Sequence, residues 1–151
     1  MQKFILLRGH EGSGKSTFAR EKMAEFQRIY PDGEVVLIDN DEALINEHGI
    51  YHFDFEQFTQ AHRDNVLRQN QAFERGLHHP ERAMLVINAN PNQKSKTCYA
   101  QIERARLHGF MVEIYRLHHD FPNVHGVAPE DVARSRTRLD ANPVLGEIHL
   151  P

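Results

Sequence analysis

The stretch from Leu6 to Arg20 reads LLRGHEGSGKSTFAR. It matches the pattern G-x-x-x-x-G-K-[ST] without a mismatch, at Gly9, Gly14, Lys15 and Ser16. Glycines at these spacings let a turn fold so tightly that its backbone N–H groups converge on one anion. The helix that follows such a turn adds its positive N-terminal end. The stretch therefore predicts a phosphate-binding loop.

The flanking residues supply the context that this pattern requires. Lys3 to Leu7 (KFILL) is apolar on consecutive positions, as buried parallel strands are, and a helix from Lys15 to Ile29 follows the loop. We expect Lys15 to reach the β- and γ-phosphates of ATP and the Ser16 hydroxyl to ligate Mg²⁺. The predicted nucleotide-binding residues are Gly9, Gly12, Ser13, Gly14, Lys15, Ser16 and Thr17.

Strand and helix patterns alternate through the rest of the chain. Strands are predicted at 34–38, 83–87 and 110–117, and helices at 54–76, 94–107 and 129–139. This alternation predicts a three-layer α/β P-loop kinase fold with a mainly parallel sheet. In the long helix, Phe55, Phe58, Val66 and Phe73 are expected to share the buried face. The pattern leaves open whether the tail from Asn142 adds an edge strand or only packs.

Bulk properties restrict the class of protein. The 151 residues, 40% apolar and 26% charged, predict a single domain, 1–151, large enough for a core. No apolar run is long enough to cross a bilayer, and the N-terminal one leads directly into the phosphate loop, so we expect a cytoplasmic protein without membrane association. A net charge of −3 argues against strong non-specific binding to nucleic acid. Nothing in the sequence indicates an obligate protein partner.

Carboxylates follow the second predicted strand, in the segment VVLIDNDEAL. The carboxyl ends of parallel strands form the ligand crevice of such sheets, so Asp39, Asp41 and Glu42 are expected on the same side as the phosphate loop. A small phosphotransferase requires a carboxylate there, to orient or deprotonate the hydroxyl that accepts the phosphoryl group. A solvated acidic turn is the alternative interpretation for each of them.

Several segments resemble one family. DNDEAL, FDFEQFTQAHRDN, VINANP and NVHGVAPEDV are similar to the P-loop kinase family that includes phage polynucleotide kinase and the kinase-like domain of NEDD4-binding proteins. The resemblance implies transfer of the ATP γ-phosphate to a hydroxyl, with Mg²⁺, and Asp41 as the residue that activates this hydroxyl. Asp39 competes for that role or holds Mg²⁺ through a water. Asn88 and Asn90 take the places of the family's D-x-N sequence after the third strand.

The sequence departs from the family at two arginines. Leu44 stands where phage kinases carry an Arg that grips the acceptor, and Pro122 stands where the family's lid, here 120–129, begins with an Arg. Loss of a transition-state arginine costs orders of magnitude in rate. Arg134 and Arg138, four residues apart on one helix face, are candidate catalytic replacements, with an ordinary surface role as the alternative.

Three functions follow. The first is a kinase whose acceptor is a nucleic acid 5′ end, the second a kinase of a small hydroxyl compound, and the third a nucleotide-binding module with little transfer activity. The histidines predict no zinc site, because His118, His119 and His125 lack a completing carboxylate or thiolate spacing. His10 is expected to contact a phosphate or face solvent, and His62 to be a buried hydrogen-bonded residue.

Overall fold

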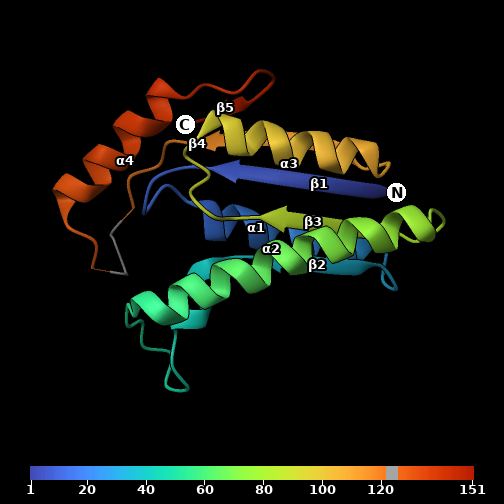
Figure 1. Ribbon diagram of the computed structural model, residues 1–151, viewed down its shortest axis with the longest axis horizontal. Helices are drawn as coiled ribbons and strands as arrows, with labels where there is room; N and C mark the ends of the chain where they lie inside the picture. Colours follow the sequence, from blue (N-terminus) through green and yellow to red (C-terminus); the bar gives the residue numbers. More distant parts are fainter. Residues whose placement is uncertain (122–125) are drawn as a thin grey trace.

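The computed structural model describes residues 1–121 and 126–151 (Figure 1). Five strands form one all-parallel sheet in the order β2-β3-β1-β4-β5. The strands are β1 (Gln2–Arg8), β2 (Glu34–Ile38), β3 (Met84–Asn88), β4 (Met111–Leu117) and β5 (Ile148–Leu150). The helices are α1 (Lys15–Ile29), α2 (Phe55–His78), α3 (Ser95–Leu107) and α4 (Pro129–Ala141), with a 3-10 helix η1 (Asn40–Leu44).

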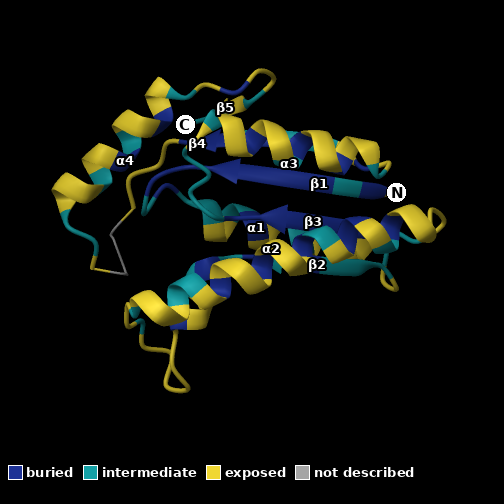
Figure 2. Cartoon of the chain, in the orientation of Figure 1, coloured by how far each residue is buried: buried dark blue, intermediate teal, exposed yellow. Residues whose placement is uncertain are grey.

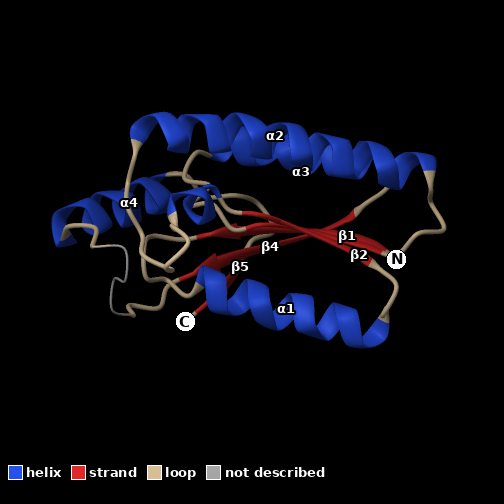
Figure 3. Cartoon of the chain, turned by 90° about the horizontal axis from the view of Figure 1, so that it is seen from below, coloured by secondary structure: helices blue, strands red, loops and turns tan. Residues whose placement is uncertain are grey.

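The helices cover both faces of the sheet. In Figure 3, α1 lies on one face, and α2 and α3 lie together on the other. The predicted three-layer α/β fold is confirmed, and the predicted strands and helices agree with the structure to within about two residues at each end. None of the helices in the described ranges combines the length and apolar character that crossing a bilayer requires.

The central strand β1 is buried on both faces because helices pack on each side of it (Figure 2). Phe4 and Leu6 contribute to the core under α2 and α3, whereas Ile5 and Leu7 contribute to the core under α1. This division follows from the two-residue period of a strand. Phe73 of α2 packs edge-on against Phe4, with ring centroids 5.1 Å apart.

The expected buried face of the long helix is confirmed for Phe73, which is fully buried, and is wrong for two of the other three residues. Phe55 is 73% exposed and Val66 is 47% exposed, so neither belongs to the core. The buried residues of α2 are Ala61, Asn65, Gln69, Ala72, Phe73 and Gly76. Their spacing of three or four residues is helical, but two of them are amides, which a hydrophobicity pattern does not count. The helix therefore packs on the sheet partly through hydrogen bonds.

The C-terminal tail adds an edge strand, which settles the question left open by its sequence. β5 pairs in parallel with β4, and the loop before it is held by Arg8 at the end of β1. The Arg8 guanidinium is fully buried, pairs with Glu147 at 2.6 Å and donates to the carbonyl of Asn142 at 2.8 Å. A buried charge needs such complete pairing, so Arg8 has a structural role.

The strand register aligns the carboxyl ends of three strands. Asn88, the last residue of β3, lies opposite Leu6 of β1 and Ile38 of β2. The segments that follow these strands therefore start at one edge of the sheet. They are the phosphate loop, η1 and the segment 89–94.

Candidate phosphate-loop site

The loop between β1 and α1 has the backbone that its glycines predict. Gly12 and Gly14 have φ angles of 79° and 97°, a region that other residues rarely adopt. A side chain at Gly9 would place its Cβ 2.2 Å from Ser13 Oγ, so the loop also needs a glycine there. Ser13 Oγ is buried and makes no hydrogen bond to the residues that the structure describes. An unpaired buried hydroxyl in an anion loop fits a ligand oxygen.

The Lys15 side chain folds back into the loop. Its ammonium donates to the carbonyls of Gly9 at 2.8 Å and His10 at 3.0 Å. Burial lowers the Lys15 pKa, and the nearby charges of Glu11 and Asp39 oppose this shift. The ammonium is thus held where the loop amides converge.

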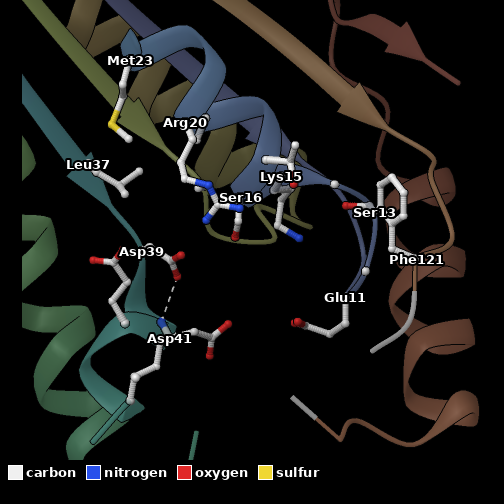
Figure 4. Close-up of a pocket in the computed structure, with 17 residues that line it drawn as sticks. Glu11, Ser13, Lys15, Ser16, Arg20, Met23, Leu37, Asp39, Asp41 and Phe121 are labelled. Carbon is white, nitrogen blue, oxygen red and sulfur yellow. Dashed lines mark hydrogen bonds between the residues drawn. The ribbon is translucent and has the colours of Figure 1, made fainter. Parts of the chain in front are cut away.

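A cavity of about 540 Å³ lies in front of the loop (Figure 4). Figure 4 shows Asp41 on one side of this cavity and Glu11 on the opposite side, with Lys15 above both in this view. The structure brings together at this cavity the following residues singled out in the sequence: Gly12, Ser13, Gly14, Lys15, Ser16, Thr17, Asp39, Asp41 and Glu42. Gly9 stands behind Ser13 and shapes the loop from outside the cavity.

Asp39 opens η1 and supports the next carboxylate. Its carboxylate accepts a hydrogen bond from the backbone N–H of Asp41 at 3.0 Å. Burial raises the Asp39 pKa to about 6, and the neighbouring negative charges of Asp41 and Glu42 add to the shift. A cation bound near Asp39 would oppose this shift, because it favours the ionised form of the carboxyl group.

Asp41 has a partner that the sequence did not indicate. The Tyr51 hydroxyl donates to Asp41 Oδ1 at 3.3 Å. Residues 45 and 51 form an antiparallel bridge, which folds the segment after η1 back over the carboxylate. Burial and the charge of Asp41 raise the Tyr51 pKa to about 12, so this phenol keeps its proton. No pattern in the sequence marks a tyrosine ten residues after an aspartate as its donor.

An arginine of α4 does approach the phosphate loop, but it is Arg136. Its guanidinium lies 3.1 Å from His10 Nε2 and 3.7 Å from Asp120. Arg134 is exposed and pairs with Asp131 of its own helix, and Arg138 is exposed as well. Neither of the two predicted arginines lines the phosphate-loop cavity.

His10 neither faces solvent nor points into the cavity. It is fully buried, and its Nδ1 lies 2.7 Å from the Glu11 carbonyl, which can only accept. Nδ1 therefore carries the proton and Nε2 accepts from Arg136. Burial, Arg136 and Lys15 lower the His10 pKa, so the ring is a neutral link between the loop and α4.

The predicted lid, 120–129, falls partly outside the described residues, which stop at Phe121 and resume at Gly126. Pro122 and His125 both lie in the part that is not described. Phe121 lines the cavity, and its backbone N–H donates to the carbonyl of Gly12 at 2.9 Å. Leu44 is 2% exposed, so the position where phage kinases carry an arginine faces the core.

The two histidines that follow β4 each contact an aromatic ring of another residue. His118 lies 2.8 Å from a ring nitrogen of His149, and His119 stacks on Phe121. His62 is hydrogen-bonded to Asn40 at 3.1 Å, as expected, but it is exposed and not buried.

The cavity fits a nucleotide with a divalent cation. Four of its lining residues are carboxylic acids, namely Glu11, Asp39, Asp41 and Glu42, against the two cations Lys15 and Arg20. The polyphosphate of a nucleotide would be repelled by this balance unless a metal ion came with it. No group of three His, Cys, Asp or Glu in the described ranges could hold a metal by itself. The carboxylates of this cavity suit Mg²⁺, because proteins usually bind this ion through one or two carboxylates together with substrate phosphates.

Comparison with known proteins gives the fold and a relative. No model of a known protein family matches the sequence. The uncharacterized protein PM0531 of Pasteurella multocida (strain Pm70) is 36% identical over 151 residues, which are 100% of this chain and 84% of that protein.

Solved structures of low identity share the architecture. Kti12 of Chaetomium thermophilum, crystallised in complex with ADP-AlF3, has a TM-score of 0.62 at 15% identity and covers 97% of this chain and 88% of its own. APE1195 has a TM-score of 0.54 at 15% identity, over 99% and 84%. A chain of the PezAT toxin-antitoxin system of Streptococcus pneumoniae has a TM-score of 0.51 at 20% identity, over 91% and 52%. At these identities the likeness supports a P-loop kinase fold and leaves the reaction open.

Proposed function

The chain belongs to the family of the uncharacterized protein PM0531, and we propose, from the residues that line its phosphate-loop cavity, that it is an ATP-dependent phosphotransferase. The reaction is transfer of the ATP γ-phosphate to a hydroxyl group, in the manner of the polynucleotide kinases that the sequence resembles. The observation that carries this proposal is one cavity that Lys15, Ser16 and Asp41 line together.

Each of these residues has a part in phosphoryl transfer. The loop amides and Lys15 hold the β- and γ-phosphates, and the exposed Ser16 hydroxyl ligates Mg²⁺, with Asp39 nearby to hold its waters. Mg²⁺ held there would supply positive charge to offset the negative charge that develops on the phosphate oxygens. Asp41 accepts the proton of the attacking hydroxyl, so that an oxygen–phosphorus bond forms as the bond to the leaving ADP breaks.

The Tyr51 hydroxyl keeps Asp41 in position for this step. A single hydrogen bond of 3.3 Å fixes one carboxylate oxygen and leaves the other for the acceptor. Tyr51 is therefore a positioning residue.

Positive charge for the transferred group comes from the nearest arginines. Arg20 lines the cavity directly, and Figure 4 shows its guanidinium beside Ser16 on the side facing Asp39. Arg134 and Arg138 keep this role as a proposal only through a movement of α4 toward the cavity, because both are exposed at present.

The test is transfer of labelled γ-phosphate from Mg·ATP to a panel of acceptors. The panel holds a 5′-hydroxyl oligonucleotide, free nucleosides and simple sugars, and each is assayed with the wild type, Lys15→Ala and Asp41→Asn. We expect label on one acceptor class, with transfer lost in both variants and ATP binding kept in Asp41→Asn.

The second candidate is a nucleotide-binding module without transfer. Leu44 in place of an acceptor-binding arginine and Asn88 in place of an aspartate favour it. ATP binding that depends on Lys15, with no labelled product from any acceptor, would establish this alternative and overturn the kinase.

A further inference from the structure

A second cavity, of about 810 Å³, lies between α2 and α3 at the same edge of the sheet. We call it the amide cavity, because carboxamides form much of its lining: Asn40, Asn65, Gln69, Asn88, Asn90 and Gln101. Among its described lining residues none is an aspartate or a glutamate. The phosphate-loop cavity and the amide cavity meet at η1, where Asn40 lines one and Asp41 lines the other.

The Arg68 guanidinium can only donate hydrogen bonds, and it fixes which way the amides near η1 point. Arg68 donates to Asn65 Oδ1 at 2.8 Å, which leaves the Asn65 amide nitrogen to donate to Asn40 Oδ1 at 2.9 Å. The Asn40 amide nitrogen then faces His62 Nδ1 at 3.1 Å, so Nδ1 accepts. The neutral His62 ring must carry its proton on Nε2, and it makes no Nε2 hydrogen bond to the described residues.

A second chain of amides starts from backbone N–H groups. The backbone N–H of Asn40 donates to Asn90 Oδ1 at 2.8 Å, which turns the Asn90 amide nitrogen outward. The backbone N–H of Asn90 donates to Asn88 Oδ1 at 3.1 Å, and the Asn88 nitrogen donates to Gln69 at 2.8 Å. The Asn90 amide nitrogen has no acceptor among the described residues. Two fixed donors thus stand at the cavity end next to η1.

The lining also holds apolar side chains. They are Phe58 and Val66 of α2, Pro91, Ala100 of α3 and Ile38 of β2. A cavity that combines apolar side chains with amides and free donors suits a planar ring that carries hydrogen-bonding groups at its rim. Amide side chains make paired hydrogen bonds to the edges of nucleobases, and apolar side chains cover their faces.

We propose that the amide cavity binds a nucleobase. The acceptors on the rim of the base take the protons of His62 Nε2 and Asn90 Nδ2, and its faces lie between Phe58 and the segment 91–100. The volume lies within the range of small-ligand sites, which is about 300 to 1,000 Å³. The lack of carboxylates in the lining suits a rim rich in oxygen and ring nitrogen, since a carboxylate would repel such acceptors.

We assign the base to the phosphate acceptor. This role rests on the proposed function, whereas the binding of a base to the amide cavity is independent of that function. Asn40 and Asp41 are consecutive, so their Cα atoms are about 3.8 Å apart. A base held beside Asn40 leaves its attached sugar at η1, with a hydroxyl directed to Asp41. The same chemistry is offered by a free nucleoside and by the terminal nucleotide of a nucleic acid.

The experiment is direct binding of adenosine, guanosine, cytidine and uridine to the full chain, followed by calorimetry and by ligand-observed NMR. Ribose is the probe that lacks a base. Ala100→Trp places a large side chain in the cavity from an exposed position on α3, and Glu103→Trp is the matched control on the same helix outside the cavity. We expect one or more nucleosides to bind, ribose not to bind, and Ala100→Trp to lose at least about tenfold in affinity.

A further binding measurement distinguishes a nucleic acid end from a free nucleoside as the source of the base. A 5′-hydroxyl dinucleotide that binds more tightly than the nucleoside, with affinity that falls as salt rises, identifies a nucleic acid end, and equal, salt-independent affinity identifies a free nucleoside. Folded wild-type protein that binds no base, or Ala100→Trp and Glu103→Trp with equal affinity, overturns the proposal. ATP binding is measured in the same samples, so base binding without phosphoryl transfer would overturn only the proposed function.

Discussion

The two cavities at the edge of the sheet differ in the kind of group that lines them. The phosphate-loop cavity is lined by charged groups, four carboxylates and two cations, set on a backbone loop that glycines shape. The amide cavity is lined mainly by neutral amides that hold one another in fixed orientations, and its charged lining residues among those described are the cations Lys94 and Arg104. Successive residues at the start of η1 line the two cavities in turn. Asp39 and Asp41 line the phosphate-loop cavity, and Asn40 lines the amide cavity.

The difference shows that one short segment presents two kinds of chemistry. Under the two proposals above, charged groups at the loop act on a polyanion and its metal, and the strength of their interactions depends on burial and on pH. Neutral amides bring no net charge and act through direction, because each donor and acceptor is set by its neighbour. The predictions below test whether the two cavities are as independent as this comparison implies.

The largest expected effect is that of Lys15→Ala on the phosphate-loop cavity. Removal of the ammonium at the loop is expected to lower phosphoryl transfer by at least about 10²-fold, the loss seen when one preorganised donor to transition-state charge is deleted. Nucleoside affinity at the amide cavity is expected to stay within about twofold of the wild type. Lys22→Ala on the same helix serves as the control, since Lys22 pairs with Glu25 away from the loop. A parallel loss of nucleoside binding would mean that the cavities are one site.

Asp39→Asn is expected to change the pH dependence of stability. The Asp39 carboxyl binds a proton up to about pH 6 in the folded protein, against an ordinary pKa of 3.8. The protonated Asp39 carboxyl therefore makes its full contribution to the free energy of unfolding below the unfolded pKa of 3.8. This contribution is lost as the pH rises through about 6. At pH 7.5 the wild type is expected to be less stable than Asp39→Asn by at most about 3 kcal/mol, with the difference vanishing near pH 4.

Urea unfolding at pH 4 and pH 7.5 measures this difference. An equal gap at both pH values would show that Asp39 is not the titrating group. Addition of Mg²⁺ with ATP at pH 7.5 is expected to close the gap, because a bound cation favours the ionised carboxylate of the wild type.

Gln69→Leu tests the amide network as a structural element. The substitution leaves Asn88 Nδ2 with only its longer bond to Gln101, of 3.1 Å, and removes the 2.9 Å bond from Gln69 to Gln101. A buried polar group that loses its partner costs about 1–3 kcal/mol, so the free energy of unfolding should fall by that amount. Asn70→Leu, at the half-buried neighbouring position, is expected to change it by less than about 0.5 kcal/mol. Equal effects of the two would contradict a network that holds α2 to the sheet.

The smallest expected effect is that of Tyr51→Phe. Loss of one 3.3 Å hydrogen bond to Asp41 is expected to lower kcat about two- to tenfold and to leave the KM for ATP unchanged. Tyr30→Phe, at the far end of α1, is the control. A change in KM for ATP alone would assign Tyr51 to nucleotide binding.

Much of the fold was predictable because it depends on local sequence. Glycines that require positive φ, continuous apolar strands and a Pro at the start of the last helix act within a few residues of themselves. The loop residues at the phosphate-loop cavity were predictable for the same reason, since Lys15 and Ser16 act through the loop that contains them.

Partners that lie far apart in the chain were not predictable. Tyr51 meets Asp41 through a bridge between two loop residues, and Arg136 meets His10 from a helix more than a hundred positions away. Arg134 and Arg138 are spaced so that they share one face of α4, as the sequence predicts. The orientation of α4 relative to the phosphate loop places Arg136, which lies between them in the sequence, against His10. A rotation of the helix that the sequence does not specify decides this.

The sequence by itself determined that this chain folds as a P-loop kinase-like α/β protein with a phosphate loop and acidic residues at one edge of a parallel sheet. Only the tertiary structure decided that α2 buries amides in place of its phenylalanine at residue 55, and so lines a second cavity. The reason is physical. Apolar burial follows a period that can be read along one chain, whereas a buried amide is stable only with partners, and those partners come from η1, β3 and α3.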